Sequence, residues 1–187
     1  KNKILDLGSD TGDIILELIK KNKIVNSQNL IILSDPNIKM IKESFKKFNN
    51  TKKIYNVANY GEELPFKSNQ FDLVTMSFSL RNTYNLKKTI KEINRVLKKN
   101  SQFLCLEFGK ISNPVINEIY QIYSQNFIPK IGSFVAENQD AYEYLIQSIK
   151  KFPDQKKLSN ILKLNGFKNV SFKNLAFGIV AIYVCNK

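Results

Sequence analysis

The sequence contains no histidine and no tryptophan, and it has only two cysteines among its 187 residues. Without histidine, the chain cannot build Ser-His-Asp or Cys-His catalytic sites, and it lacks the commonest general base and metal ligand of proteins. The two cysteines, Cys105 and Cys185, lie far apart, and each falls within a strand-like pattern. We therefore expect buried free thiols in a reducing compartment, and we expect no metal site.

Long hydrophobic runs are also lacking. No apolar run is long enough to cross a bilayer, and no signal peptide is visible. The chain has no initiator Met and opens directly on a strand-like pattern, so we expect an N-terminal segment of the full-length protein to precede it. A targeting segment could lie in that part. The length suits one domain with a sizeable core, and we expect a single domain over residues 1–187.

Acidic residues are few relative to basic ones, at 16 against 29, which gives a formal net charge of +13. Such a balance occurs in proteins that bind nucleic acid or an anionic membrane surface. The basic residues are mostly lysine, and asparagine is abundant beside them, which is what an A+T-rich genome produces. We favour this composition bias as the explanation, ahead of attraction to a membrane surface and then nucleic-acid binding.

The chain is organised around the stretch from Lys3 to Asp13. Its apolar run over residues 4–7 is typical of a buried parallel strand. The run ends at Gly8, Gly12 follows, and a helical pattern begins after it. Strand, glycine turn and helix form the opening of a nucleotide-binding βαβ unit, in which glycines let the backbone pass close to a ligand. A tight strand-to-helix turn without a ligand is the alternative.

A carboxylate follows the next expected strand. Leu30 to Leu33 is apolar, and Asp35 stands just beyond its end. A carboxylate at this point, roughly 20 residues past the glycine turn, can accept hydrogen bonds from both hydroxyls of a ribose. The alternative is a helix N-cap for the segment that begins near Asn37.

The rest of the chain alternates strands with helices, which predicts right-handed crossovers and a parallel sheet. Further strands are expected over 53–58, 71–77 and 103–108, and helices over 37–48 and 86–97. Helical patterns then follow over 116–127, 140–151 and 156–164, with Asp140 as an expected N-cap. Two closing strands over 170–175 and 179–185 predict an antiparallel hairpin.

The glycine turn carries a first resemblance. It reads Asp6-Leu7-Gly8-Ser9-Asp10-Thr11-Gly12 and resembles motif I of the class I S-adenosylmethionine methyltransferases, Asp/Glu-x-Gly-x-Gly-x-Gly. Asp10 replaces the middle glycine and adds a negative charge beside the expected cofactor carboxylate. This resemblance implies an α/β, Rossmann-like fold. Its seven-stranded, mostly parallel sheet would have the order 3-2-1-4-5-7-6, with helices on both faces.

Later stretches carry a narrower resemblance. The main ones are Glu62-Glu63-Leu64-Pro65-Phe66, Phe78-Ser79-Leu80-Arg81-Asn82, Leu104-Cys105-Leu106-Glu107-Phe108 and Phe152-Pro153-Asp154-Gln155. Together they resemble the ubiquinone/menaquinone biosynthesis C-methyltransferases of the UbiE type. The Arg-Asn pair and the Phe-Pro-x-Gln stretch are the most specific of these signatures, and the resemblance runs from Ile4 to the C-terminus.

The resemblance implies an S-adenosylmethionine-dependent C-methyltransferase. Its methyl acceptor would be a ring carbon of a polyprenyl benzoquinol or demethylmenaquinol, activated by a neighbouring phenolate. We expect S-adenosylmethionine as cofactor, and a peripheral membrane protein that takes its quinol from a bilayer without spanning it. We also expect assembly as a homodimer or within a quinone-biosynthesis complex, and we expect no binding to nucleic acid. The location would be the matrix face of the mitochondrial inner membrane or a bacterial cytoplasm.

The resemblance also implies residue roles. Nine residues are expected to bind the cofactor: Asp6, Gly8, Thr11, Gly12, Asp35, Tyr60, Gly61, Glu62 and Ser77. Arg81 and Asn82 are expected to be catalytic. The fixed charge of Arg81 can lower the pKa of a phenol or orient a water that carries the proton away. A salt bridge that closes the end of the sheet is the alternative for Arg81.

Aromatic residues are expected to line a pocket for the isoprenoid quinol. They are Tyr120, Tyr123, Phe127 and Tyr142, for which ordinary core packing is the alternative. At Tyr60 the family usually has an Asp or Asn that binds the adenine amino group. Together with Asp10, this departure leaves open the alternative that the protein is a non-catalytic scaffold subunit of a quinone-synthesis complex. A second alternative is another small-molecule methyltransferase with the same fold.

Overall fold

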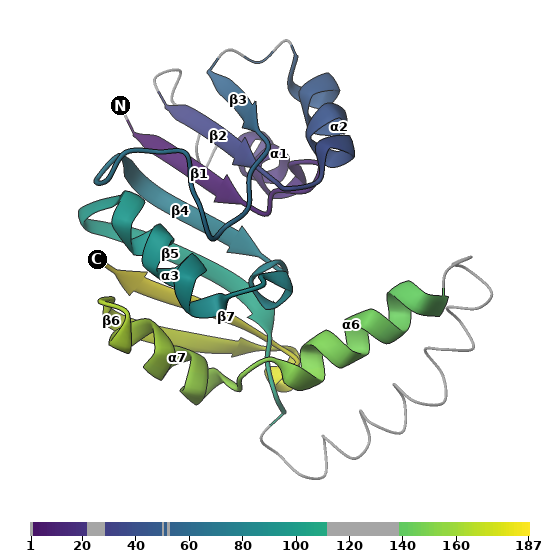
Figure 1. Cartoon of the computed structure of the whole chain (residues 1–187), viewed down its shortest axis with the longest axis vertical. Coiled ribbons are helices and arrows are strands. Elements are labelled where there is room, and N and C mark those ends of the chain that lie inside the picture. Colours follow the sequence, from purple (N-terminus) through teal and green to yellow (C-terminus); the bar gives the residue numbers. More distant parts are fainter. Residues whose placement is uncertain (1, 22–28, 50, 52, 112–138) are drawn as a thin grey trace.

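The computed structural model describes residues 2–21, 29–49, 51, 53–111 and 139–187. Within these residues, one seven-stranded sheet has the order β3-β2-β1-β4-β5-β7-β6, which confirms the predicted order (Figure 1). The strands are β1 Lys3–Leu7, β2 Leu30–Ser34, β3 Ile54–Val57, β4 Phe71–Ser77, β5 Leu97–Phe108, β6 Lys168–Leu175 and β7 Val180–Asn186. The helices are α1 Asp13–Lys20, α2 Ile38–Phe48, η1 Leu80–Asn82, α3 Leu86–Val96, α6 Gln139–Lys151, α7 Gln155–Leu164 and η2 Ala176–Gly178.

The glycine-turn strand β1 lies inside the sheet, paired in parallel with β2 on one side and β4 on the other. Its apolar run is buried because helices cover the sheet, as expected for parallel strands. At the other end of the sheet, β7 runs antiparallel between β5 and β6. The predicted closing hairpin is therefore confirmed.

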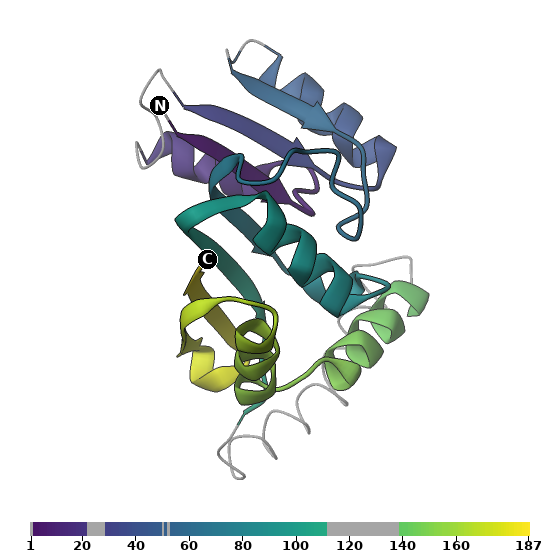
Figure 2. The same ribbon diagram turned by 60° about the vertical axis from the view of Figure 1, so that its left-hand side comes forward.

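Two clusters of buried side chains lie against the sheet. One joins Ile15 of α1 and Phe48 of α2 to residues of β1 and β2. The larger cluster joins α3 and α7 to the strands, with Ile93 and Leu158 among its fully buried members. Figure 2 shows α3 and α7 lying together on one face of the sheet. The amphipathic period of these helices explains why one stripe of each is buried.

Two local predictions need correction, and a third is not tested. Strand β5 begins at Leu97 instead of Phe103, because its first residues pair with β4 across a register shift and Asn100 turns the chain with a φ of 62°. Helix α6 begins at Gln139, so Asp140 lies within its first turn and is not an N-cap. An acidic side chain in a first turn still favours the helix dipole. The expected helix over 116–127 lies outside the described residues.

Both cysteines are buried free thiols, which confirms that prediction. Burial raises the pKa of Cys185 to about 12, and it raises the pKa of Cys105 as well. Neither thiol is therefore a nucleophile at neutral pH.

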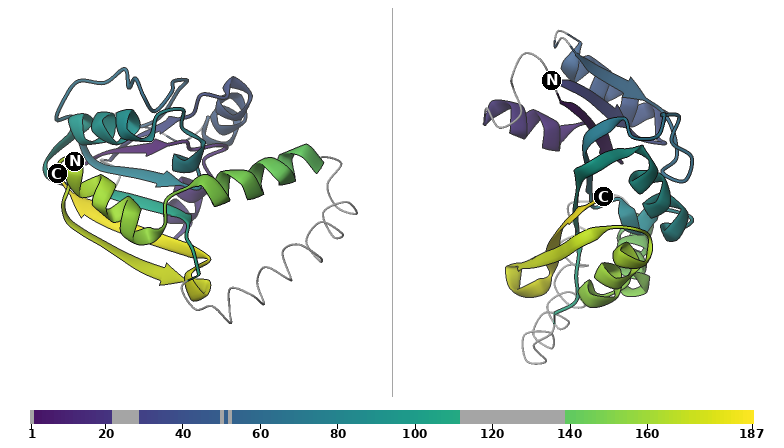
Figure 3. Two further views of the ribbon diagram at one scale, coloured as in Figure 1. Left: turned by 60° about the horizontal axis from the view of Figure 1, so that its bottom comes forward. Right: turned by 90° about the vertical axis from the view of Figure 1, so that its left-hand side faces the viewer.

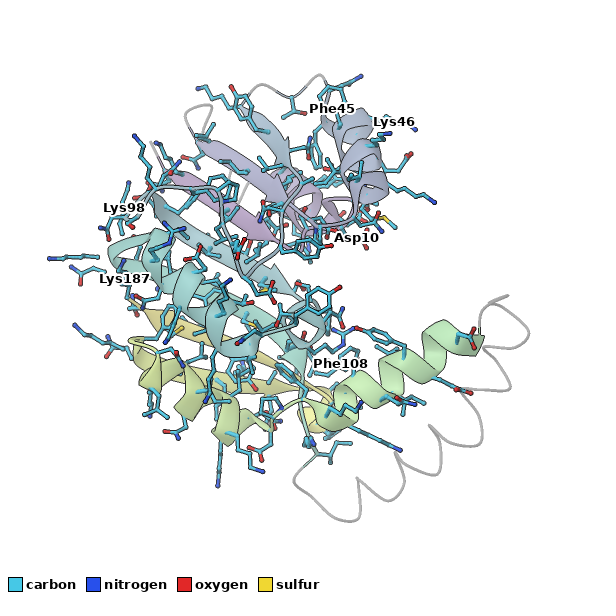
Figure 4. All side chains as sticks on the ribbon, viewed as in Figure 1. Asp10, Phe45, Lys46, Lys98, Phe108 and Lys187 are labelled. Carbon is cyan, nitrogen blue, oxygen red and sulfur yellow. The ribbon has the colours of Figure 1, made fainter. Side chains whose placement is uncertain are left out.

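The parallel strands end along one edge of the sheet, and α6 extends beyond that edge (Figure 3, left). Figure 4 shows Asp10 and Phe108 at this edge, and Lys98 and Lys187 at the opposite one. Ligands of open α/β sheets bind at the carboxyl ends of the strands. Among the described residues, no helix is long and apolar enough to cross a membrane.

Candidate functional site

The glycine turn folds tightly over the end of β1. The backbone N–H groups of Gly8 and Ser9 both donate to the carbonyl of Ser34, at 2.7 and 3.0 Å. Gly8 has a φ of +66°, and a Cβ added to it would lie 2.3 Å from Oγ of Ser79. Only glycine therefore fits at this point, where the turn passes over the tip of β4.

Asp35 ties this turn to the end of β2. Its carboxylate accepts the backbone N–H of Asp10 at 3.0 Å and that of Asn37 at 2.8 Å. The N-cap of α2 is Asn37, whose side chain accepts the N–H of Lys39. The N-cap alternative for Asp35 is thus not what the structure shows. Asp10 has a φ of 51° and is exposed, so its side chain faces solvent beside the turn.

Asp6 is a buried acid with an unused oxygen. It is 2% exposed, and one oxygen accepts the hydroxyl of Thr75 at 2.6 Å. The other oxygen has no partner among the described residues, as is also true of the hydroxyls of Ser9 and Ser77. Burial raises the pKa of Asp6 to about 6, and the charge of Asp35 adds to the rise. Such a carboxylate suits a ligand that brings a positive charge.

Gly12 and Thr11 close the turn onto the helices. Gly12 has a φ of 80° and is the N-cap residue of α1. The hydroxyl of Thr11 donates to Asp13 at 2.7 Å and accepts from Lys47 of α2 at 3.1 Å. Lys47 also forms an ion pair with Asp13 at 2.6 Å. These contacts fix the turn between α1 and α2.

The segment after β3 packs on α3. Glu62, which is 9% exposed, accepts the backbone N–H of Asn85, the N-cap residue of α3, at 3.0 Å. A Cβ on Gly61 would approach Cγ2 of Thr89 to 2.9 Å, so the backbone here lies close to the helix. Both residues therefore place the segment after β3 against the start of α3.

Tyr60 presents an aromatic ring at the same edge. It is 54% exposed, and its ring centroid lies 5.9 Å from that of Tyr84, which is 86% exposed. The neighbouring Asn59 accepts the hydroxyl of Ser34 at 2.9 Å. The edge thus offers a carboxylate from β2 and an exposed aromatic pair near the end of β3.

Arg81 lies in η1, directly after β4. Its side chain is 9% exposed and pairs with the fully buried Glu107 of β5, at 3.2 Å to one oxygen and 3.3 Å to the other. The same guanidinium nitrogen, Nη1, donates to the carbonyl of Phe78. The guanidinium also lies over the ring of Phe108, 5.0 Å from its centroid. The predicted salt bridge therefore exists, and Nε of Arg81 stays buried without a partner among the described residues.

Beside Arg81 lies a cavity of about 300 Å³ between η1 and α6. It is lined by Leu80, Arg81, Thr83, Leu86, Tyr144, Gln147, Ser148, Lys151, Phe152 and Pro153. At its rim, the hydroxyl of Tyr144 donates to Asn82 at 3.3 Å. An arginine thus forms part of the wall of a cavity with apolar and hydroxyl-bearing walls.

The edge of the sheet brings together the expected residues of β1, β2, β3, β4 and η1. The aromatic residues expected to line the quinol pocket cannot be compared in the same way. Tyr120, Tyr123 and Phe127 lie outside the described residues, as does the side chain of Tyr142. Their roles stay predictions.

Two residues with clear roles in the structure were not assigned one from sequence. Glu107 binds Arg81. The sequence does contain a signal for it, because Glu107 is an acid that alternates along one strand with the buried residues Phe103 and Cys105. Gln155 joins three elements. It accepts the N–H of Lys110 at 3.0 Å and donates to the carbonyls of Lys110 and Gly178, at 3.1 and 3.3 Å.

Comparisons with known proteins give consistent matches. A model of the ubiE/COQ5 methyltransferase family matches residues 1–187. A ubiquinone/menaquinone biosynthesis C-methyltransferase UbiE of Rickettsia typhi is 44% identical over 192 residues, which cover 100% of this chain and 76% of that protein. A methyltransferase structure from Aquifex aeolicus, described as SAM dependent, matches with a TM-score of 0.70 and 15% identity, over 98% of this chain and 81% of that one. A phosphoethanolamine N-methyltransferase from Haemonchus contortus, in complex with S-adenosyl-L-methionine, matches with a TM-score of 0.72 and 11% identity, over 100% of this chain and 48% of that one.

Proposed function

The chain belongs to the ubiE/COQ5 methyltransferase family, and we propose that it methylates a ring carbon of a polyprenyl quinol with S-adenosylmethionine. The match to the family model and to the UbiE relative confirms the resemblance found in the sequence. It also confirms the methyltransferase class and S-adenosylmethionine as the cofactor. The observation that carries the site is the buried Arg81, whose Nε–H is unpaired and which lines a cavity at the carboxyl edge of the sheet.

The residues at the end of β1 fit the cofactor. When bound, S-adenosylmethionine supplies an electrophilic methyl group. The free oxygen of Asp6 and the unpaired hydroxyls of Ser9 and Ser77 suit its charged amino-acid portion. Asp35 can accept ribose hydroxyls with its remaining lone pairs, and the Tyr60 ring can cover the adenine. Glycine at position 8 keeps the backbone clear of a side chain.

Arg81 is the group that we assign to the quinol. A guanidinium stays charged at any working pH, so it is a poor proton acceptor but a good donor to a developing phenolate. Because Glu107 and Phe78 occupy Nη1, the remaining N–H groups of the guanidinium are the donors left for a ring oxygen or for a water that relays its proton. Asn82 would hold the same ring edge.

We place the reaction at a membrane surface, because a polyprenyl tail keeps the quinol in a bilayer. The formal net charge of +13 would favour anionic lipid. The Rickettsia relatives are bacterial, which favours the inner surface of a bacterial membrane over the mitochondrial alternative. Assembly as a homodimer or within a quinone-synthesis complex remains an expectation.

The cofactor role of Asp35 is tested by calorimetric titration with S-adenosylmethionine. Asp35→Ala removes a carboxylate that can accept two ribose hydroxyls, so we expect binding to weaken by about 1–3 kcal/mol. Asn37→Ala is the control, since it loosens the start of α2 and leaves the carboxylate in place. Equal dissociation constants for the wild type and Asp35→Ala would exclude the ribose contact. No measurable binding by the wild type would favour the scaffold alternative.

The quinol position is tested by filling the cavity. Ser148 lines it, and its hydroxyl bonds only within α6, to the carbonyl of Leu145 at 2.8 Å among the described residues. Ser148→Trp should raise KM for the quinol by about tenfold or more, because a bulky side chain occupies the space of the ring. Lys150→Trp adds the same side chain at an exposed position of α6 and should leave KM unchanged. An unchanged KM in Ser148→Trp would place the ring elsewhere.

A further inference from the structure

Glu107 is an acid without solvent contact in a chain that has no histidine. Its side chain is 0% exposed, and it comes from β5, a different strand from the one that leads into Arg81. Burial raises the pKa of Glu107, while the charge of Arg81 acts in the opposite direction. A buried acid beside the proposed catalytic arginine is either a proton acceptor or a holder of that arginine, and its contacts decide between the two.

Both oxygens of Glu107 are occupied. Oε1 accepts the backbone N–H of Arg81 at 3.1 Å and its Nη1 at 3.2 Å. Oε2 accepts the backbone N–H of Phe108 at 2.8 Å and the same Nη1 at 3.3 Å. Each oxygen therefore has two donors and no path to solvent, which leaves no place for a substrate proton. The contacts fit a group that acts through Arg81.

We propose that Glu107 is the positioning residue of the active site, which fixes the guanidinium of Arg81 at the wall of the cavity, where it donates to the quinol. The inference rests on the proposed catalytic role of Arg81. Glu107 holds both the backbone and the side chain of Arg81, so it sets where η1 begins as well as where the guanidinium points.

The surroundings show why a holder is needed. Arg81 follows Phe78, a non-glycine residue with a φ of 53°, in a single turn of 3₁₀ helix. A short turn after a left-handed residue does not by itself fix a long side chain, which loses rotamer entropy when it is ordered. Phe108 stacks under the guanidinium, but a stacking contact leaves rotation in the ring plane free. The two-oxygen contact of Glu107 removes that freedom.

The same pair also makes a buried guanidinium tolerable. A buried charge without a partner is strongly destabilising, whereas Arg81 and Glu107 together are neutral. Arg81 would therefore act on the quinol through a directed N–H group more than through net charge. The catalytic effect of Arg81 then depends on the angle and distance between its N–H group and the quinol oxygen. Changes at Glu107 should therefore alter turnover.

The test uses Glu107→Gln, which keeps the shape and the acceptor oxygen and loses the charge and the second acceptor. We expect kcat to fall by about 10–100-fold, because small misplacements of a catalytic group have effects of this size. The dissociation constant of S-adenosylmethionine should stay within about twofold of the wild-type value. Asp72→Asn is the matched control: this carboxylate pairs with Lys98 at the opposite edge of the sheet, and its loss should leave kcat unchanged.

A double-mutant cycle separates positioning from general stability. If Glu107 acts only through Arg81, adding Glu107→Gln to Arg81→Ala should lower kcat no further. Glu107→Asp, which keeps the charge on a shorter side chain, should recover part of the loss, and it replaces Glu107→Gln if that variant does not fold. A normal kcat in both Glu107 variants, or a full additional loss in the double variant, would overturn the inference. A normal kcat in Arg81→Ala alone would instead overturn the catalytic role of Arg81, on which the inference rests, and would leave methyl transfer to the quinol standing.

Discussion

Arg81→Ala is expected to lower turnover by about 10²–10³-fold, the effect seen when a donor to a transition-state charge is removed. The chain has no histidine to accept a phenol proton, and the 9% exposed side chain of Arg81 belongs to a residue that lines the cavity. The dissociation constant of S-adenosylmethionine should barely change, because the proposed partner of Arg81 is the quinol oxygen. Arg81→Lys should recover only part of the activity, since a point charge cannot reproduce the planar fork.

The ion pair with Glu107 makes a stability measurement part of this experiment. Removing Arg81 leaves a buried acid without its partner, which costs about 3–5 kcal/mol for an ionised group and less if Glu107 takes up a proton. Turnover must therefore be measured at a temperature where Arg81→Ala is folded, as judged by its cofactor binding. Near-normal turnover of the folded variant would leave Arg81 with the structural role alone.

Asp6→Asn is expected to stabilise the cofactor-free protein and to weaken cofactor binding. The pKa of Asp6 is raised by burial from 3.8 to about 6. Below pH 3.8 this acid is protonated in both the folded and the unfolded chain. Between pH 3.8 and about 6 the unfolded chain ionises while the folded chain keeps the proton, so the free energy of unfolding falls by about 3 kcal/mol in total and levels off above about pH 6. Asn cannot ionise, so the variant should lack that part of the decline.

The size of the gain is limited by the amide. Its NH₂ group replaces an oxygen that has no partner among the described residues, and an unpaired donor costs about 1 kcal/mol or more. We therefore expect a net rise in the free energy of unfolding of about 1–2 kcal/mol at pH 8, measured by urea denaturation against the wild type. Cofactor affinity should fall at least tenfold if the carboxylate meets a cationic group. A less stable variant at pH 8 with normal cofactor affinity would contradict both expectations.

The fold was largely predictable because its signals are local and repeated. Apolar runs of strand length, helical periods and the glycine turn each specify their own element, and the parallel order follows from the alternation. The errors lie at boundaries. The start of β5 at Leu97 depends on a register shift against β4, and a pattern along one segment does not show how its partner strand is aligned.

The site was predictable where a motif occupies one continuous stretch. The glycine turn and Asp35 were found because strand ends and turn residues are adjacent in the sequence. The pairing of Arg81 with Glu107 joins residues 26 positions apart, and the three contacts of that carboxylate with Arg81 depend on how β4 and β5 are aligned. The Phe-Pro-Asp-Gln signature was recognised in the sequence. The contacts by which Gln155 joins the end of β5 to η2 are visible only in the folded chain.

The central claim is methyl transfer to a quinol, and one measurement tests it most directly. The protein is incubated with S-adenosylmethionine that carries a deuterated methyl group, together with a short-chain polyprenyl benzoquinol or demethylmenaquinol in anionic vesicles, and the product is analysed by mass spectrometry. The account predicts a deuterated methyl group on a ring carbon, formed by the wild type and reduced by about 10²–10³-fold in Arg81→Ala. Labelled product on an oxygen, or no labelled quinol of either type from a protein that binds the cofactor, would contradict it.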